Sequence, residues 1–297
     1  MSKPLENNFK EEKIKEEEIF TKFKTPRVLK VREEPPDPRL LPLHPNIPQI
    51  PSLILGIGSY ASGKTFLMNS MLLQSRENGF YGAQDLFDET IIMSATLSND
   101  PAGRFLKKAF TCTDGYQDGM ITELMEKQKS YGEKKNMPFI ALFADDILSR
   151  NLKRNSELSF LCCKFRHHNI GLLCVMVQNF KSVDTIIRNN SSDIIVFRQT
   201  NKKQLEQIEE EFGGVFEGNF MELYKIATAK KYDFMYIRMK TQECFRCFEE
   251  KIGQNGDILV GDNRIPDDKD AGLPQTSNTP DNPVDSLTED KKTENGR

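Results

Sequence analysis

The chain has 297 residues, which is enough for one large α/β domain or at most two small ones. Hydrophobic residues make up 37% and charged residues 29%, and no apolar run approaches the roughly 18 residues that a membrane span needs, so a membrane-embedded protein is excluded. Six cysteines are too few for a disulfide scaffold, and the first residues, MSKPLENNFKEEK, lack the apolar block of a secretion signal. We therefore expect reduced thiols, a cytosol-like compartment and no membrane partner.

The net charge of −3 is unevenly distributed along the chain. Residues 249–297 carry twelve acidic and six basic side chains, a net charge of −6, which leaves a net charge of +3 on residues 1–248. The acidity of the chain is therefore a property of its C-terminal part. A nucleic-acid partner for the rest of the chain is not excluded.

Both ends of the chain differ in composition from the middle. Residues 1–47 are charge-rich and then proline-rich. Residues 11–18 mix charges at helical spacing, so a short amphipathic helix with an extended arm is one interpretation and a disordered leader is the other. No aromatic residue follows Phe248, so we expect residues 249–297 to be a disordered acidic tail. One domain then remains, at residues 48–248.

Within this domain, short apolar runs alternate with helical patterns. In chain order, we expect strands at residues 52–57, 90–94, 139–144, 172–177, 194–197 and 234–237, the last being the final strand, and helices at residues 63–76, 157–166, 202–212 and 220–230. Continuous apolar strands separated by helices are typical of a largely parallel sheet that is buried on both faces. The predicted fold class is therefore α/β, with helices on both faces of a central sheet.

The first predicted strand leads into a glycine-rich motif. The motif is Gly58-Ser59-Tyr60-Ala61-Ser62-Gly63-Lys64-Thr65, and it matches the phosphate-loop (Walker A) pattern G-x-x-x-x-G-K-[ST], with a strand before it and a helix after it. The backbone N–H groups of such a loop surround a phosphate, and the helix presents its positive end to the anion. We expect Lys64 to bind the β- and γ-phosphates and Thr65 to ligate Mg²⁺. The alternative is a glycine turn before an ordinary helix.

Polar residues also follow directly after the strands predicted at residues 139–144 and 172–177. We interpret Asp145 as a Mg²⁺ ligand and Asp146 as the base that polarises the attacking water, the alternative being a solvated carboxylate pair. Because residues 90–94 form a strand between the two motif strands in sequence, we expect an extra strand to separate those two in the sheet. Gln178 ends the fourth strand, where it would contact the γ-phosphate or orient water, and a structural amide is the alternative.

Together these motifs resemble those of a known family. The phosphate loop, the strand ending in Asp145-Asp146, the turn Arg166-His167-His168, the strand ending in Gln178, the segment Ile187-Arg188-Asn189 and the strand Tyr232-Asp233-Phe234-Met235-Tyr236-Ile237 are similar to those of the genome-packaging ATPases of poxviruses, other large DNA viruses and virophages. That family belongs to the FtsK–HerA branch of the RecA-like (ASCE) P-loop NTPases. The resemblance implies ATP and Mg²⁺ as cofactors.

The resemblance also implies partners and a place of action. It implies a homo-oligomeric ring, a pentamer or hexamer, that drives double-stranded DNA without sequence choice into a capsid, beside a capsid or portal vertex protein. The expected place is the cytoplasm or virus factory of an infected host cell, or the virion. In such rings an arginine of one subunit completes the catalytic site of its neighbour. The candidates are Arg166 and Arg188, then Arg150 and Arg154, each with a surface or ion-paired arginine as the alternative.

Other features leave alternatives open. Cys244 and Cys247 have the C-x-x-C spacing of half a zinc site or a redox pair, but no second pair follows. Four lysine pairs can contact DNA phosphates or simply face solvent: Lys107-Lys108, Lys134-Lys135, Lys202-Lys203 and Lys230-Lys231. The acidic tail can dock on a capsid protein or only increase solubility. The rival functions are a conjugation-type DNA pump or helicase-like ATPase, and a nucleotide-gated scaffold subunit.

Overall fold

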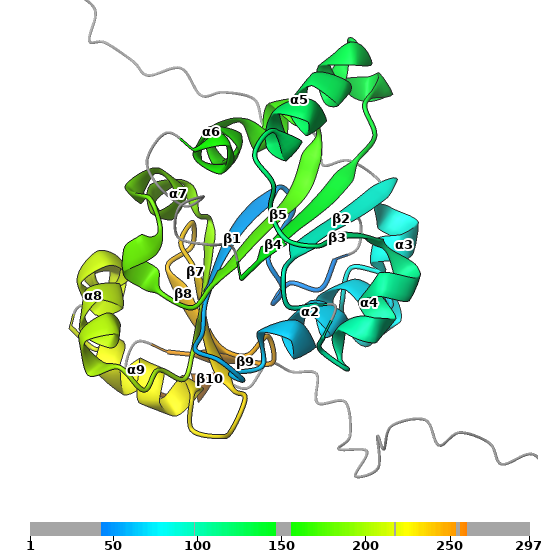
Figure 1. Ribbon diagram of the computed structural model, residues 1–297. Helices are drawn as coiled ribbons and strands as arrows, with labels where there is room; N and C mark the ends of the chain where they lie inside the picture. The colour runs from blue at the N-terminus through cyan, green and yellow to red at the C-terminus, as the bar shows by residue number, and fades with distance from the viewer. Residues whose placement is uncertain (1–42, 98, 147–155, 217, 254–255, 260–297) are drawn as a thin grey trace, which may run out of the picture.

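A computed structural model gives the fold (Figure 1), and it describes residues 43–97, 99–146, 156–216, 218–253 and 256–259. In these ranges, the strands form one ten-stranded sheet in the order β10-β9-β8-β7-β6-β1-β5-β4-β2-β3. The strands are β1 (Ser52–Ile57), β2 (Glu89–Ser94), β3 (Thr111–Thr113), β4 (Ile140–Asp145), β5 (Ile170–Val177), β6 (Asp193–Phe197), β7 (Phe234–Arg238), β8 (Glu243–Arg246), β9 (Glu250–Ile252) and β10 (Ile258–Leu259). The α-helices are α2 (Lys64–Leu73), α3 (Ala83–Leu86), α4 (Gly103–Ala109), α5 (Met120–Ser130), α6 (Glu157–Lys164), α7 (Thr185–Asn190), α8 (Lys202–Phe212) and α9 (Phe220–Ala227).

The centre of the sheet is parallel. The neighbouring strands from β6 to β3 all run parallel, and β7 to β10 extend the sheet in antiparallel fashion. The predicted α/β fold class is therefore confirmed. The expected extra strand between the two motif strands is β5, the strand before Gln178, whereas β2 lies on the far side of β4. The C-terminal ends of β1, β5 and β4 consequently meet at one edge of the sheet.

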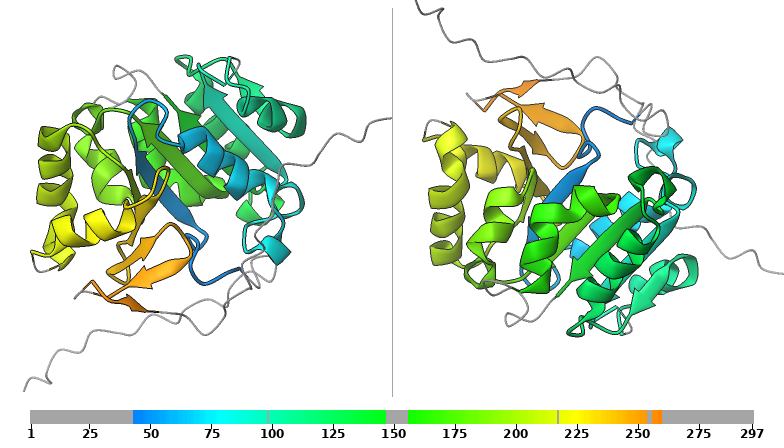
Figure 2. Two further views of the ribbon diagram at one scale, coloured as in Figure 1. Left: turned by 90° about the horizontal axis from the view of Figure 1, so that it is seen from below. Right: turned by 90° about the horizontal axis from the view of Figure 1, so that it is seen from above.

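The sheet is buried on both faces because its central strands are apolar along their whole length. All eight residues of β5 are buried, and the side chains of β1 alternate between two hydrophobic clusters. Leu53, Leu55 and Ile57 belong to the cluster that α5 to α9 complete, and Ile54 belongs to the cluster that α2, α3 and α4 complete. Figure 2 shows helices on opposite sides of the sheet.

The sheet extends further along the chain than we expect from the sequence. The prediction that residues 234–237 form the final strand is wrong, because β8, β9 and β10 follow and carry the sheet into the predicted tail, 249–297. These strands have only two to four residues, and β9 reads Glu250-Lys251-Ile252, so no apolar run marks them. The short elements β3, α3, α4 and α7 and the largely polar helix α5 escape prediction for the same reason.

Several expectations concern residues outside the described ranges. These include the predicted helix at residues 11–18, residues 1–42 of the predicted arm, and residues 260–297 of the predicted tail. The last residue of that arm, Ile47, is 2% exposed and packs in the core. Among the described helices, none combines the length and the apolar character that a membrane crossing requires.

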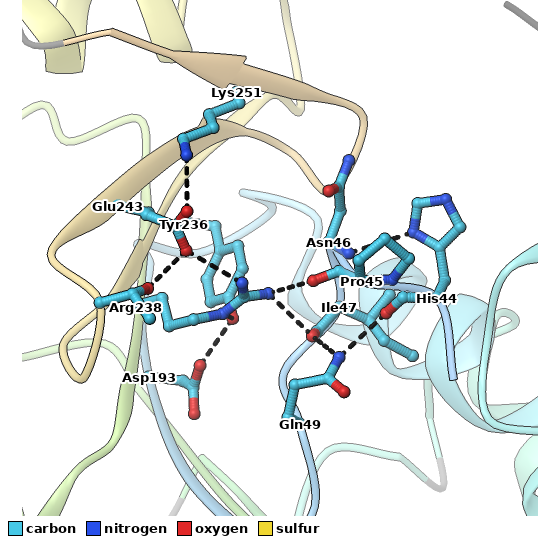
Figure 3. Close-up of polar contacts among 11 residues, drawn as sticks. His44, Pro45, Asn46, Ile47, Gln49, Asp193, Tyr236, Arg238, Glu243 and Lys251 are labelled. Carbon is cyan, nitrogen blue, oxygen red and sulfur yellow. Dashed lines mark hydrogen bonds and ion pairs between the residues drawn. The ribbon is translucent and has the colours of Figure 1, made fainter. Parts of the chain in front are cut away.

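Arg238 on β7 fastens the segment before β1 to the antiparallel part of the sheet (Figure 3). Its Nη2 donates to the carbonyls of Pro45 at 2.5 Å and Ile47 at 3.1 Å, and its Nη1 lies 3.1 Å from Glu243 Oε2. The other oxygen of Glu243 accepts from Lys251 Nζ at 2.6 Å. The charged cluster therefore joins β7, β8 and β9 to the chain that enters β1.

The network continues through Tyr236 to the buried carboxylate of Asp193, because Arg238 Nε donates to Tyr236 Oη at 3.2 Å. Asp193 is 3% exposed and accepts hydrogen bonds from Ser52 Oγ at 2.6 Å and Ser192 Oγ at 2.7 Å. It also accepts a hydrogen bond from Tyr236 Oη at 2.6 Å (Figure 3). Burial and the neighbouring carboxylate raise the pKa of Tyr236, so the phenol stays protonated and donates. This satisfied network fixes the start of β1 against β6 and β7, at the end of β1 opposite the phosphate loop.

Candidate nucleotide-binding site

The phosphate loop connects β1 to α2 and has a backbone conformation that its glycines permit. The N–H of Gly58 donates to Val177 O at 2.9 Å, which fixes the start of the loop against β5. A Cβ at Gly58 would lie 2.4 Å from Ser62 Oγ and 2.9 Å from Phe197 Cδ2, so a larger residue would clash. Gly63 has a φ of +106° directly before α2, a value that other residues rarely adopt.

The N-terminus of α2 offers hydrogen-bond donors that fit a phosphate. In the part of the chain that the structure describes, the N–H groups of Gly63, Lys64 and Thr65 have no acceptor, and no side chain caps the helix. The buried hydroxyl of Ser62 has no partner either. Because unpaired buried polar groups are costly, a ligand with several acceptor oxygens matches this place.

Lys64 is the buried cation of the loop. Its side chain is 7% exposed, and Nζ donates to the carbonyls of Gly58 at 3.0 Å and Ser59 at 3.2 Å. Nζ also lies 3.8 Å from Asp146 Oδ1. The ammonium group therefore stands between the loop and the acidic doublet, where it can interact with a phosphate held by both.

Asp145 ends β4 as a buried carboxylate that is only partly hydrogen-bonded. It is 2% exposed, Oδ2 accepts from Ser94 Oγ at 3.0 Å, and Oδ1 has no partner among the described residues. Burial, followed by the charge of Asp146, raises the pKa of Asp145 to about 6. Burial and the neighbouring charge destabilise the ionised carboxylate, so a cation bound at the unpaired oxygen would stabilise it. The other predicted metal ligand, Thr65, is half-buried in the first turn of α2.

Asp146 is the first residue beyond β4, and its carboxylate is held from two sides. Gln178 Nε2 donates to Oδ1 at 2.9 Å, and Thr96 Oγ1 lies 3.4 Å from Oδ2. The backbone φ of Asp146 is +49°, an uncommon conformation that is found at functional sites. The predicted residues Lys64, Asp146 and Gln178 are thus brought together, although β2 and β3 separate β1 from β4 along the chain.

Sequence reasoning missed a second layer of polar residues around Gln178. Gln204 on α8 donates through Nε2 to Gln178 O at 3.1 Å and to Gln199 Oε1 at 2.7 Å, and its Oε1 accepts from the N–H of Phe180 at 3.3 Å. Gln199 Nε2 in turn donates to Ile57 O at 3.0 Å, at the entry to the phosphate loop. The only sequence signal is the position of Gln199 just after an apolar strand. Gln204 looks like an ordinary helix residue.

Among the described residues, no hydrogen bond or ion pair joins Arg166 or Arg188 to the cluster, although Arg188 Cζ lies 5.1 Å from the centroid of the Phe180 ring. Arg166 is exposed in the 3₁₀ turn before β5, and its Cζ lies 5.3 Å from the centroid of the Phe165 ring. Eight residues of β5 separate that turn from Gln178, a distance of about 26 Å. Arg188 is engaged within the chain: Nη1 lies 2.5 Å from Glu211 Oε2. The further candidates Arg150 and Arg154 lie outside the described residues.

The C-x-x-C pair belongs to a β-hairpin. Cys244 is buried in β8, and Cys247 lies in the turn before β9 with a φ of +53°. Within the described ranges, no group of three or more His, Cys, Asp or Glu side chains is arranged to hold a metal ion. A Mg²⁺ site at a phosphate loop does not need such a group, because phosphate and water supply most of its ligands.

Comparison with known proteins gives structural neighbours only. No family model matches the chain, and no curated protein matches it. The chain is similar to the genome packaging NTPase B204 from Sulfolobus turreted icosahedral virus 2 in complex with AMP, at 17% identity and a TM-score of 0.48, over 65% of this chain and 95% of that one. It is also similar to B204, the DNA-packaging ATPase from Sulfolobus turreted icosahedral virus, at 14% identity and a TM-score of 0.48, over 68% and 97%.

A third solved structure comes from a bacterium. It contains ATPases 2 and 3 of EssC from Geobacillus thermodenitrificans, at 17% identity and a TM-score of 0.38, over 53% of this chain and 34% of that one. By their descriptions, two of these three neighbours are packaging enzymes.

Proposed function

We propose that this protein is a Mg²⁺-dependent ATPase that works as a motor and translocates double-stranded DNA into a viral capsid. The observation that carries the ATPase part is the cluster of Lys64, Asp146 and Gln178 beside the phosphate loop. A cation at the start of α2, with a carboxylate and an amide just beyond β4 and β5, can bind the phosphates and orient the water in phosphoryl transfer.

Each residue has a place in the proposed reaction. The loop N–H groups and the Ser62 hydroxyl bind phosphate oxygens, and Lys64 exchanges its present carbonyl partners for the β- and γ-phosphates. Thr65 and the unpaired oxygen of Asp145 are the residues that would hold Mg²⁺. When bound, Mg²⁺ neutralises charge on the phosphate oxygens. The protein excludes bulk water here because Lys64 and Asp145 are already buried.

Asp146 and Gln178 act on the attacking water. The Asp146 carboxylate accepts a proton from the water as the water oxygen bonds to the γ-phosphorus, the bond from that phosphorus to the β-phosphate oxygen breaks, and ADP and phosphate leave. Gln178 holds that carboxylate in position by its hydrogen bond. The second carboxylate favours hydrolysis over a nucleotide-gated scaffold, because a protein that only assembles on ATP does not require a base at this position.

The motor part of the proposal rests on the sequence resemblance. It implies that the subunits form a pentameric or hexameric ring around duplex DNA, which they bind without sequence choice. The ring would work beside a capsid or portal protein in an infected host cell. The position of Arg166 is compatible with this arrangement. At about 26 Å from its own Gln178, it can complete a catalytic site only in a neighbouring subunit.

Duplex DNA separates a DNA-translocating ATPase from a nucleotide-gated scaffold. We expect phosphate release by the full chain to rise strongly when duplex DNA is added, as for a DNA motor or pump. Slow turnover that ignores DNA would favour the scaffold. Electron microscopy with a non-hydrolysable ATP analogue and duplex DNA then tests the ring, and we expect closed rings with DNA in the channel. Rings on single strands only would favour the helicase-like alternative.

A further inference from the structure

Tyr232 is an exposed aromatic residue at the edge of the sheet where the phosphate loop lies. Its side chain is 54% exposed and belongs to the turn between α9 and β7. Phe234, which begins β7, pairs with Phe197, which ends β6. The turn therefore lies at the same edge as the ends of the parallel strands. In the strand order β7-β6-β1-β5-β4, it is on the side of the loop opposite Asp145.

The side chain of Tyr232 lies against the phosphate loop. A Cβ at Gly63 would be 3.4 Å from Tyr232 Cδ1 and 3.6 Å from Tyr232 Cβ, which is ordinary van der Waals contact. Lys231 Nζ lies 4.7 Å from the centroid of the ring, a cation–π contact that helps to orient it. The ring is thus placed next to the last loop residue before α2, with half of its surface left open.

The backbone at Tyr232 is unfavourable for a tyrosine. The N–H of Asp233 donates to Lys230 O at 3.4 Å, which closes a β-turn with Tyr232 at its third position and a φ of +73°. Glycine or asparagine is preferred at such a position. Neither local propensity nor burial explains a large aromatic ring here. A ligand that contacts the ring does explain it.

The residues on either side of the phosphate loop indicate which way a bound nucleotide would point along the sheet edge. Asp146 and Gln178 place the γ-phosphate on the β4 and β5 side, and the phosphates then cross the loop toward Gly63 and the start of α2. The nucleoside end consequently points toward β6 and β7. We propose that the Tyr232 ring stacks on the nucleobase of the triphosphate bound at the phosphate loop. This inference rests on the proposed ATP-binding function and adds the nucleobase contact to it.

If Tyr232 stacks on the nucleobase, its removal should affect only ligands that carry a base, whereas a role in supporting Gly63 would affect every ligand of the loop. Every nucleobase has a π-face, and base–aromatic stacking is typically worth a factor of about 5 to 150 in affinity. Inorganic tripolyphosphate contains the phosphates without the base. Loss of the ring should therefore weaken ATP binding and leave tripolyphosphate binding intact. If Tyr232 only supports the conformation of Gly63, both ligands should weaken together.

The test is isothermal titration calorimetry of the full chain with Mg²⁺ and either ATP or tripolyphosphate. We expect Tyr232→Ala to weaken ATP binding about 5- to 150-fold and tripolyphosphate binding less than about twofold, and Tyr232→Phe to stay within about threefold for both. Phe160→Ala is the matched control, because Phe160 is 53% exposed on α6, away from the loop, and should change neither.

Three outcomes would overturn the inference. Unchanged ATP binding in Tyr232→Ala would show that the ring does not contact the base. Parallel weakening of ATP and tripolyphosphate would assign Tyr232 to the support of the loop, and the ATPase proposal would survive. If the unsubstituted chain bound neither ligand, the phosphate loop would not hold a nucleotide, and the proposed function would fail together with the inference.

Discussion

Gln178 Nε2 donates a 2.9 Å hydrogen bond to Asp146 Oδ1, which joins the ends of two neighbouring strands, β5 and β4. The N–H of Asp146 donates to Met176 O at 3.2 Å, so β5 holds both the backbone and the side chain of this aspartate. The uncommon φ of +49° at Asp146 is thereby stabilised by its neighbours. The carboxylate is consequently held 3.8 Å from the Lys64 ammonium.

Substitution of Lys64 separates catalysis from folding. We expect Lys64→Ala to lower phosphate release about 100-fold or more, because no other side chain of the loop carries a positive charge to the phosphates. The far-ultraviolet circular dichroism spectrum should not change, since the polar partners of the lysine among the described residues are loop carbonyls and Asp146 and none belongs to the packing of a helix. Lys225→Ala, an exposed lysine on α9, is the control. Undiminished turnover in Lys64→Ala would remove the enzyme interpretation.

The raised pKa of Asp145 links stability to pH. Because its pKa in the folded protein, about 6, exceeds the ordinary value of 3.8, folding favours the protonated form. This contribution to stability is fully present below pH 3.8 and is lost as pH rises through about 6. Asp145→Asn should therefore increase the unfolding free energy of the ligand-free protein at pH 7 by on the order of 1–3 kcal/mol, and much less near pH 4.

Urea unfolding at both pH values measures this difference, with the exposed Asp85→Asn as the control. Since Mg²⁺ and the proton compete for this carboxylate, the Mg²⁺ concentration that gives half-maximal hydrolysis should rise as the pH drops below about 6, and hydrolysis should be lost in Asp145→Asn. A stability gain that is equal at both pH values would contradict the raised pKa.

Gln204 offers a test of the second polar layer. It holds Gln178 O and the N–H of Phe180, so we expect Gln204→Ala to loosen Gln178 and lower kcat about 10-fold with little change in KM. Glu210→Ala, exposed on the same helix, is the matched control and should leave kcat unchanged. An increase in KM at constant kcat would instead assign Gln204 to nucleotide binding.

Substitutions in the Arg238 cluster should lower the unfolding free energy without changing the nucleotide-binding site. Arg238→Met removes hydrogen bonds to Pro45 O and Ile47 O and leaves Glu243 with one fewer partner, so we expect a loss of about 2–4 kcal/mol in unfolding free energy. Arg246→Met breaks an ion pair with Glu250 near the sheet edge and should cost less than about 1 kcal/mol. Equal losses in the two variants would mean that the contacts to the segment before β1 contribute nothing.

The sequence predicts the central part of the fold well because burial on both faces leaves a strong signal. The bounds of β1, at residues 52–57, and of α8, at residues 202–212, are as expected. The phosphate loop is readable because its glycines are a steric requirement, as the contacts at Gly58 show. Asp146 and Gln178 could be placed near the loop because parallel strands bring their C-terminal ends to one edge.

Tertiary contacts determine what the sequence does not reveal. Gln204 enters the site because α8 packs beside the ends of β5 and β6, and nothing in its own helix pattern marks it. The strand β8 forms because β7 offers it an edge to pair with, and β9 pairs in turn with β8; such short strands would not form alone. The left-handed backbone at Tyr232 likewise depends on the turn that joins α9 to β7.

The most direct measurement of the central claim is phosphate release, together with ATP affinity, for the full chain and its Asp146→Asn variant in Mg²⁺. We predict that the variant binds ATP within about threefold of the unsubstituted chain and hydrolyses it about 10²- to 10⁴-fold more slowly. Turnover at the unsubstituted rate in Asp146→Asn would contradict the assignment of this carboxylate, and with it the reaction built around Lys64, Asp146 and Gln178.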